Sequence, residues 1–390
     1  MGITARQLTL ATLDRQLLLR REPLDVAEAV RRICAAQAQA AASPYLALWN
    51  RVSGFAPDDL DAAFAQGRVV KASLMRITLH AVHGADYADC HAAMRASLRG
   101  ARVYDRRFTS AGLTAADADG LLAELPGLLA GPRTGAQMEE ELGRRFGAGA
   151  QRLWWALRTY APLHHVPTGG PWAFRLPNTY RAAPAAPSAD PGPDLGPEDG
   201  ADTAEDAAVQ RLLLAYLRAF GPATARDFAR FTLLTSPVVR RALDRLGERV
   251  VPVAGPDSGA LLDLADATVP EPDTPAPPRL LPMWDSVLMA YAGHGRIVPE
   301  EYRPLIVRRN GDTLPTLLVD GQVAGVWRAV DGGVELTAFR PLRAARWRAL
   351  TEEAERLSAL LADREPAVYS RYRHWWDKGF PADRTTVVTP

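Results

Sequence analysis

The sequence predicts a helix-rich α+β protein made of three tandem winged-helix units and a C-terminal β region that contains a hairpin. Two observations support this fold class. Helical patterns followed by two short alternating strands recur three times along the chain, and this is the element order of a winged helix. Two acidic, proline-rich stretches without periodicity then read as linkers that separate the third unit from its neighbours.

Length and composition are those of a globular protein with several compact units. The chain has 390 residues, of which 47% are hydrophobic and 23% charged. No apolar run approaches the roughly 18 residues that a membrane span needs, and arginines stand where a secretory signal would be apolar. We therefore expect a cytoplasmic, nucleoid-associated monomer without membrane contact. Cys34 and Cys90 are too few for a disulfide framework and lack metal-ligand spacing, so no metal or other cofactor is expected.

The cations are almost all arginines. The net charge of +1 argues against a globally basic surface for nucleic acid. However, Lys71 and Lys378 are the only lysines in the sequence, and the planar guanidinium suits phosphate recognition. A GC-rich genome would explain much of the same bias.

The first unit spans residues 1–100. Its helical patterns cover 4–20 and 26–39, with Asp25 as the N-cap of the second, and a third helix follows Asp58 and Asp59. The stretch "RVVKASLMRITLHAVHG" then alternates apolar and polar residues, which predicts two short strands.

The second unit spans residues 101–182. The stretches "LTAADADGLLAEL", "TGAQMEEELGRRF" and "GAQRLWWALRTYA" predict three helices. They lead into "LHHVPTGGPWAFRLP", which predicts a hairpin with Gly169 and Gly170 at its tip. Trp154, Trp155 and Tyr160 have helical spacing and are expected in the core rather than as platforms for bases.

The third unit spans residues 205–267, between linkers at 183–204 and 268–278. Three helical patterns precede "RVVPVAGPDSGALLDLA", two strands with a turn near Asp257. Candidate recognition helices of the second and third units carry exposed cations that would contact DNA, or that would simply face solvent in a protein-interaction module. These residues are Arg152, Arg158, Arg240, Arg241 and Arg245.

The C-terminal region spans residues 279–390. Asp320-Gly321 lies between alternating apolar runs and predicts a hairpin with a type I′ turn, and a charged helix is expected over 343–363. The hairpin is either an ordinary sheet element or a finger that enters a groove of DNA. On the second interpretation its DNA-binding residues are Asp320, Gly321, Gln322 and Arg328. Lys71 of the first unit is separately expected to contact phosphate or solvent.

Four stretches in this order, "AAQAQAAASPYLALWNRV", "RITLHAVHGADY", "LPMWDSVLMAY" and "GDTLPTLLVDGQVAGVWR", resemble the winged-helix DNA glycosylases of the AlkZ type. The resemblance implies a C-shaped protein around double-stranded DNA, excision of alkylated purines, unhooking of interstrand crosslinks and a catalytic Gln-apolar-Gln motif. That motif falls on Gln37, Ala38 and Gln39. Relatives often have an Asp-Arg pair where this chain has Gly293-His294, so His294 is given no functional role.

Both glutamines can act together only if the backbone leaves the helix near them, because positions i and i+2 of a helix point apart. Pro44 supports this, since it disfavours helix at Ser43. Neutral amides can orient water and stabilise an oxocarbenium-like sugar, but they cannot transfer protons. Such a site suits an N7- or N3-alkylpurine, which is already cationic and leaves as a neutral base.

The shortage of lysines predicts a monofunctional enzyme, because cleavage of the DNA backbone through a Schiff base needs a well-placed amine. Two groups of histidines are further candidates for a site. His80 and His83 are expected on one face of a strand with Asp86 following, as structural histidines or as a metal or acid–base site, and His164 and His165 would adjoin phosphate. The alternative to an enzyme is a non-catalytic winged-helix DNA-binding protein or transcription regulator.

Overall fold

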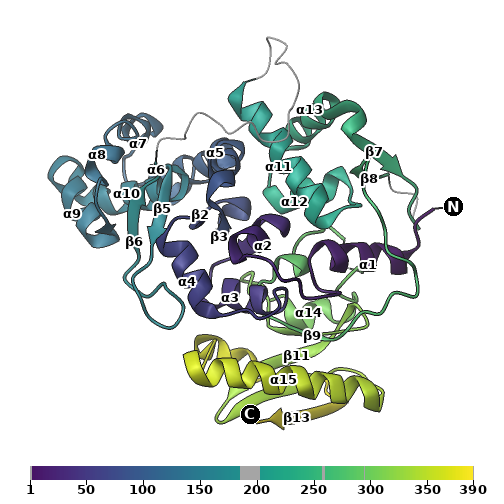
Figure 1. The fold of residues 1–390 in the computed structure, drawn as a ribbon. Coiled ribbons are helices and arrows are strands. Elements are labelled where there is room, and N and C mark those ends of the chain that lie inside the picture. Colours follow the sequence, from purple (N-terminus) through teal and green to yellow (C-terminus); the bar gives the residue numbers. More distant parts are fainter. Residues whose placement is uncertain (1, 185–202, 257–259, 294, 390) are drawn as a thin grey trace.

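The computed structural model describes residues 2–184, 203–256, 260–293 and 295–389. It is a mixed fold in which helices predominate, as the sequence predicts. Figure 1 shows α15 (Ala344–Arg364) and the strands of the C-terminal sheet at the bottom of the view, below the N-terminal helices. The helices α7 (Ala115–Gly120), α8 (Leu125–Leu128) and α9 (Gly135–Phe146) lie at its left edge. No helix among the described residues is long and apolar enough to cross a membrane.

The first four helices are short, and side chains cap the N-termini of the first two. Thr4 forms a capping box with Gln7, and the Asp25 carboxylate accepts from Ala27 N–H as predicted. The second helix ends at Arg32 rather than at residue 39, because Cys34 adopts a left-handed conformation with φ 69°. These helices are α1 (Ala5–Arg15), α2 (Val26–Arg32), α3 (Ala42–Trp49) and α4 (Pro57–Ala65).

One six-stranded sheet joins the predicted first and second units. Its order is β1-β3-β2-β5-β6-β4, so the two predicted hairpins pair with each other, with Lys71 of β2 opposite His165 of β5. The strands are β1 (Ala36–Gln37), β2 (Val69–Ser73), β3 (Leu79–His83), β4 (Arg133–Thr134), β5 (Leu163–Val166) and β6 (Thr179–Ala182). The glycines expected at the tip of the second hairpin, Gly169 and Gly170, lie in a long connection and both have positive φ.

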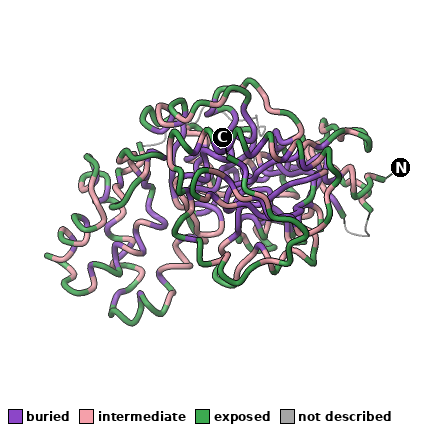
Figure 2. Tube along the Cα trace, turned by 90° about the horizontal axis from the view of Figure 1, so that it is seen from below, coloured by how far each residue is buried: buried purple, intermediate pink, exposed green. Residues whose placement is uncertain are grey.

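The helices of the second unit differ from prediction in two places. The first of them, α5, runs across the predicted boundary at residue 100. The stretch 113–125, predicted as one helix, forms α7 and a turn that leads into α8. Figure 2 shows that this end of the molecule is mostly exposed or half-buried, whereas buried residues concentrate in the rest. The helices are α5 (Tyr87–Val103), α6 (Arg106–Thr109), α7 (Ala115–Gly120), α8 (Leu125–Leu128), α9 (Gly135–Phe146) and α10 (Ala150–Tyr160).

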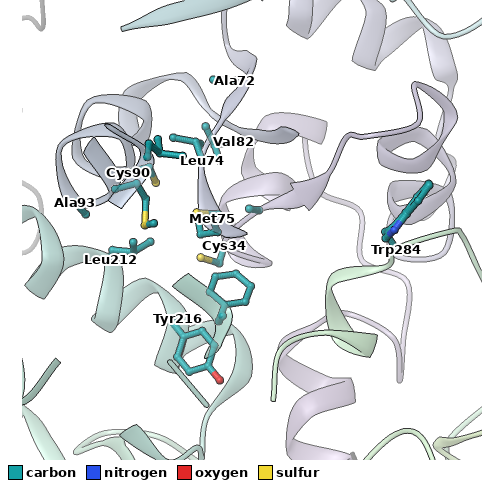
Figure 3. Close-up of a cluster of buried hydrophobic side chains, with 14 of the residues drawn as sticks. Cys34, Ala72, Leu74, Met75, Val82, Cys90, Ala93, Leu212, Tyr216 and Trp284 are labelled. Atoms are coloured by element: carbon teal, nitrogen blue, oxygen red, sulfur yellow. The ribbon is translucent and has the colours of Figure 1, made fainter. Parts of the chain in front are cut away.

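The third predicted unit has three helices followed by a two-stranded antiparallel sheet; its expected turn at Asp257 lies outside the described residues. Figure 3 shows Leu212 and Tyr216 beside Cys34, Met75 and Cys90, and all five belong to one buried cluster that ties this unit to the first. The elements are α11 (Ala204–Phe220), α12 (Ala225–Thr232), α13 (Ser236–Leu246), β7 (Val250–Val253) and β8 (Leu261–Leu264).

The C-terminal region is a five-stranded antiparallel sheet in the order β13-β12-β11-β10-β9, and α15 packs on it through Trp347, Leu350 and Leu357. The predicted helix is confirmed within a residue at each end. The elements are β9 (Arg279–Leu281), α14 (Arg303–Ile306), β10 (Thr316–Val319), β11 (Gln322–Val330), β12 (Gly333–Ala338), α15 (Ala344–Arg364), η6 (Ser370–Trp375, a 3-10 turn) and β13 (Arg384–Val388).

Candidate active site

The two glutamines of the Gln-Ala-Gln motif lie on a strand and the bend that follows it. Gln37 ends β1 and pairs with His80 of β3, and Gln39 comes two residues later, outside any helix. The departure from helix expected for joint action is therefore present. Its cause differs from the predicted one: Ser43 and Pro44 lie inside α3, where a proline in the first turn is tolerated because its missing N–H would have no helical partner.

The side chain of the first glutamine holds the backbone of the second. Gln37 is 3% exposed, and its Oε1 accepts a hydrogen bond of 2.7 Å from the backbone N–H of Gln39. Gln39 itself is exposed, and its Oε1 accepts only a long bond of 3.4 Å from Leu79 N–H. The pair thus meets in space, with Gln37 buried as a support and the Gln39 amide directed toward solvent.

Residues of the C-terminal region close the inner side of this bend. Ser286 Oγ donates to the carbonyl of Ala35 at 2.9 Å, one residue before β1. A narrow space next to Gln37 is bounded by Ser43 and Trp284, and it has no room for a water molecule. A base could therefore not enter beside Gln37 without rearrangement, so a ligand would reach the motif from the Gln39 side.

A buried ion pair fixes this contact between distant parts of the chain. The Arg51 guanidinium donates to both carboxylate oxygens of Asp285 at 2.8 Å, and Asn50 Nδ2 donates to the carbonyl of Leu280 at 2.8 Å. These residues belong to the "WNRV" and "LPMWDS" stretches. The sequence alone does not reveal this ion pair, because Arg51 and Asp285 are separated by more than two hundred positions.

The turn before β3 places Arg76 next to His80, the strand neighbour of Gln37. Arg76 and Ile77 both have positive φ, 53° and 60°, which is strained for an arginine and more so for a β-branched residue. The Arg76 guanidinium donates to the carbonyl of Phe231 at 3.1 Å and lies 3.3 Å from His80 Nε2. Sequence reasoning missed Arg76, and nothing in its local pattern marks it.

His80 is held neutral. Burial, and then the charge of Arg76, lower its pKa to about 3. Nδ1 lies 3.1 Å from the carbonyl of Thr78, so Nδ1 carries the proton and donates, while Nε2 accepts from Arg76. His80 therefore cannot supply a proton near neutral pH.

The expectation that His80 and His83 share one face is wrong, because residues three apart in a strand point to opposite sides. His80 is buried, whereas His83 is half-exposed and its Nδ1 accepts from Ala85 N–H. Asp86 is 3.1 Å from Arg31 in an ion pair. Among the described residues there is no cluster of His, Cys, Asp and Glu that could hold a metal ion.

Residues 30–360 match the family model described as "DNA glycosylase AlkZ-like". The chain belongs to the AlkZ-like DNA glycosylase family. It is 26% identical over 375 residues to an "Interstrand DNA cross-link repair glycosylase" of Streptomyces sahachiroi, covering 90% of this chain and 94% of that protein. The solved structure of Streptomyces sahachiroi DNA glycosylase AlkZ shares the fold with a TM-score of 0.74 and 23% identity, over 94% of this chain and 98% of that one.

Family membership identifies a DNA glycosylase with DNA as its partner. The hairpin predicted to enter DNA packs partly on the N-terminal helix. Its type I′ turn is confirmed, with φ 53° at Asp320 and 88° at Gly321. Its tip packs against α1: Arg6 donates to the Asp320 carbonyl at 2.6 Å, and a Cβ on Gly321 would lie 2.8 Å from Thr9 Cγ2. One side of the hairpin tip therefore packs on α1, while Gln322 is exposed and lines a surface hollow together with Asp320. Contact of this hairpin with DNA stays a prediction.

The other residues expected to contact DNA lie in varied surroundings. Lys71 is 4% exposed, and its ammonium lies over the Phe174 ring at 4.4 Å, out of reach of a phosphate on the surface. Burial lowers the pKa of Lys71 to about 8. Gln322 is exposed, and Arg328 forms a 2.8 Å ion pair with Glu335. The three arginines of α13 are exposed, and Arg241 forms an ion pair with Asp206 at 3.6 Å; these are Arg240, Arg241 and Arg245.

The remaining candidates are structural. Trp154 and Tyr160 are core residues as predicted, whereas Trp155 is half-buried under the guanidinium of Arg102 at 4.5 Å. Burial lowers the pKa of His164 to about 4, and that of His165 well below its ordinary value. Both therefore stay neutral, which is unsuited to phosphate binding.

Proposed function

We propose that this chain is a monofunctional, metal-independent DNA glycosylase that hydrolyses the N-glycosidic bond of cationic N7- or N3-alkylpurines. The observation that carries the proposal is the neutral chemistry of the site. Gln39 is exposed, Gln37 supports it, and His80, which pairs with Gln37 across the sheet, has a pKa of about 3. A site without a proton donor near neutrality suits a base that already carries positive charge and needs no protonation to leave.

The two glutamines then have different roles. The Gln39 amide would orient the attacking water or stabilise the positive charge that develops on the sugar. The Gln37 Oε1 would keep the Gln39 backbone in the bend that directs this amide outward. Gln37 acts as a positioning residue in this proposal, and Gln39 as the catalytic residue.

Bulky adducts and interstrand crosslinks fit the same site. Ser43, Trp284 and their neighbours leave no room for a base next to Gln37. The damaged nucleotide would therefore approach the bend from the exposed side that carries Gln39. The curated relative named an interstrand DNA cross-link repair glycosylase supports crosslinked DNA as a substrate class. Repair, or self-resistance to an alkylating natural product, would be the biological role of a monomer with this activity.

Formation of a Schiff base needs an accessible amine. Lys71 is buried on β2 with its ammonium against Phe174, so it is not such an amine. Lys378 is exposed, and the borohydride test below covers it as well. A winged-helix regulator, the alternative from sequence, would bind DNA without releasing a base.

The test is incubation of the purified protein with N7-methylated duplex DNA under single-turnover conditions. We expect release of free 7-methylguanine, an abasic product with an uncut backbone, no effect of EDTA and no adduct trapped by borohydride. DNA binding without base release would favour the regulator. Metal dependence or a trapped adduct would contradict the proposed chemistry.

A further inference from the structure

A segment near the C-terminus combines exposed cations with aromatic residues. Its sequence is "SRYRHWWDKGF", residues 370–380, and it lies beyond the part of the chain that matches the family model. Arg371, Arg373 and Lys378 are exposed, and none of the three forms an ion pair in the described part of the chain. Its only acidic residue is Asp377. Lys378 is also the one lysine of the sequence that is exposed, since Lys71 is buried.

This cationic segment begins next to two residues that enclose Gln37. The hydroxyl of Tyr369 is hydrogen-bonded to Ser43 Oγ at 2.9 Å, and the ring of Tyr372 packs edge-on against Trp284 with centroids 5.3 Å apart. Ser43 and Trp284 bound the same narrow space as Gln37. Two side-chain contacts therefore connect the segment to the residues that enclose the motif.

The cations are carried on a fixed platform. Trp375 Nε1 donates a hydrogen bond to Asp312 Oδ2 at 2.8 Å, which anchors the segment to the loop before β10. The Arg308 guanidinium lies between the rings of Trp375 and Phe380, at 5.1 and 5.5 Å from their centroids. Because the aromatic residues hold the segment in place, its exposed cations need little further ordering to bind a ligand.

A second cation from the sheet faces the same segment. Arg373 and Arg328 both line a surface hollow of about 210 Å³ at the end of β11. Arg328 is already paired with Glu335, and Asp331 also lines this hollow. Arg371 and Arg373 are therefore the groups best placed to accept new anionic partners.

We propose that residues 370–380 bind the sugar-phosphate backbone of DNA beside the glutamine pair, with Arg371 and Arg373 as the phosphate-contacting residues. The proposal rests on the proposed function, because the contacts to Ser43 and Trp284 matter only if the motif acts on DNA. Guanidinium groups on a rigid surface suit phosphate oxygens, and such contacts hold a duplex in register without reading its sequence.

The test uses the full chain and a short fluorescein-labelled, undamaged duplex, with binding followed by anisotropy between about 50 and 200 mM KCl. We expect Arg371→Ala/Arg373→Ala to bind about tenfold or more weakly at low salt. The slope of log K against log salt should fall in magnitude by about 1.8, which corresponds to two lost phosphate contacts. Arg371→Lys/Arg373→Lys keeps the charge and should retain most of the slope.

The matched control removes two other exposed arginines that form no ion pair in the described structure, Arg343 and Arg348 at the start of α15. Arg343→Ala/Arg348→Ala should leave the slope unchanged. An unchanged slope for the 371/373 pair, or an equal loss in the control, would overturn the proposal. Because binding is measured on undamaged DNA, absent base release by the wild type would instead count against the proposed function.

Discussion

The guanidinium of Arg51 and the carboxylate of Asp285 form a bidentate ion pair, with both hydrogen bonds at 2.8 Å and side-chain exposures of 1% and 0%. This pair joins the chain just after α3 to the segment that donates to the carbonyl of Ala35 through Ser286. The bend that carries Gln37 and Gln39 is thus supported by two regions far apart in sequence, and its geometry depends on the C-terminal region being folded.

Loss of one partner of this pair should be strongly destabilising. Asp285→Ala leaves the Arg51 guanidinium buried without its counter-charge, so we expect the free energy of unfolding to fall by about 3–5 kcal/mol in urea denaturation. Glu22→Ala is the control, because its partner Arg20 is 82% exposed and such a pair contributes about 1 kcal/mol or less. Similar small losses in both variants would show that the buried pair is not a structural requirement.

Substitutions of the two glutamines should separate their roles. Gln39→Ala should slow single-turnover base release by about a hundredfold, which corresponds to roughly 3 kcal/mol in the barrier, with the free energy of unfolding nearly unchanged. Gln37→Ala should slow release as well and also lower stability by about 1–3 kcal/mol, because it removes the acceptor of the Gln39 N–H from a buried site. A rate of base release near that of the wild type in both folded variants would contradict the roles proposed for Gln37 and Gln39.

The rate of base release should vary little with pH. Gln side chains do not titrate, and the pKa of His80 is about 3, so single-turnover release should be nearly flat between about pH 6 and 8.5 on saturating DNA. The measurement is the release rate across this range. A bell-shaped profile would place a titrating group in the chemical step, with His83 and Asp86 to be substituted first.

Stability, in contrast, should depend on pH. His80 has a folded pKa of about 3 and an ordinary pKa of 6.5, so below pH 6.5 the unfolded state binds a proton that the native state does not. Stability from this residue is complete above about pH 6.5 and is lost as the pH falls toward 3. Between pH 7.5 and 5.5 we expect a loss of about 1.4 kcal/mol from His80 alone.

The measurement is urea denaturation at these two pH values for the wild type and His80→Gln. The variant should lose about 1.4 kcal/mol less than the wild type over this interval. His164 and His165 also have lowered pKa values and should contribute to the loss that remains. An equal pH dependence in both proteins would contradict the neutral state assigned to His80.

Two turn glycines offer a direct test of the contact between the hairpin tip and α1. Gly321 (φ 88°) and Gly332 (φ 74°) both have left-handed backbones, so either change to alanine should cost about 1 kcal/mol. At Gly321 the new Cβ would also meet Thr9 Cγ2 at 2.8 Å, whereas at Gly332 it would meet nothing within 4 Å. Gly321→Ala should therefore lower the melting temperature by several degrees more than Gly332→Ala. Equal shifts would indicate that the tip is free of α1.

Local patterns predicted the elements well, but not their contacts. Alternation located β2 and β3, and Asp320-Gly321 predicted the type I′ turn, because both signals lie within a few residues. The end of α2 was missed because Cys34, an ordinary thiol in sequence, takes φ 69° through tertiary packing. For the same reason, sequence could nominate Gln37 and Gln39 but could not show that one supports the other. The number of winged-helix units and a C shape around DNA stay predictions.

The pairing of Lys71 with His165 places β2 inside a continuous sheet, between β3 and β5. A fragment that stopped near residue 100 would remove β5 and leave β2, which is largely buried in the whole protein, as an open edge. Open apolar edges recruit other strands, so such a fragment would tend to self-associate. The first two units should therefore fold only as one piece. Their separate contributions to function are best measured with point substitutions in the whole chain.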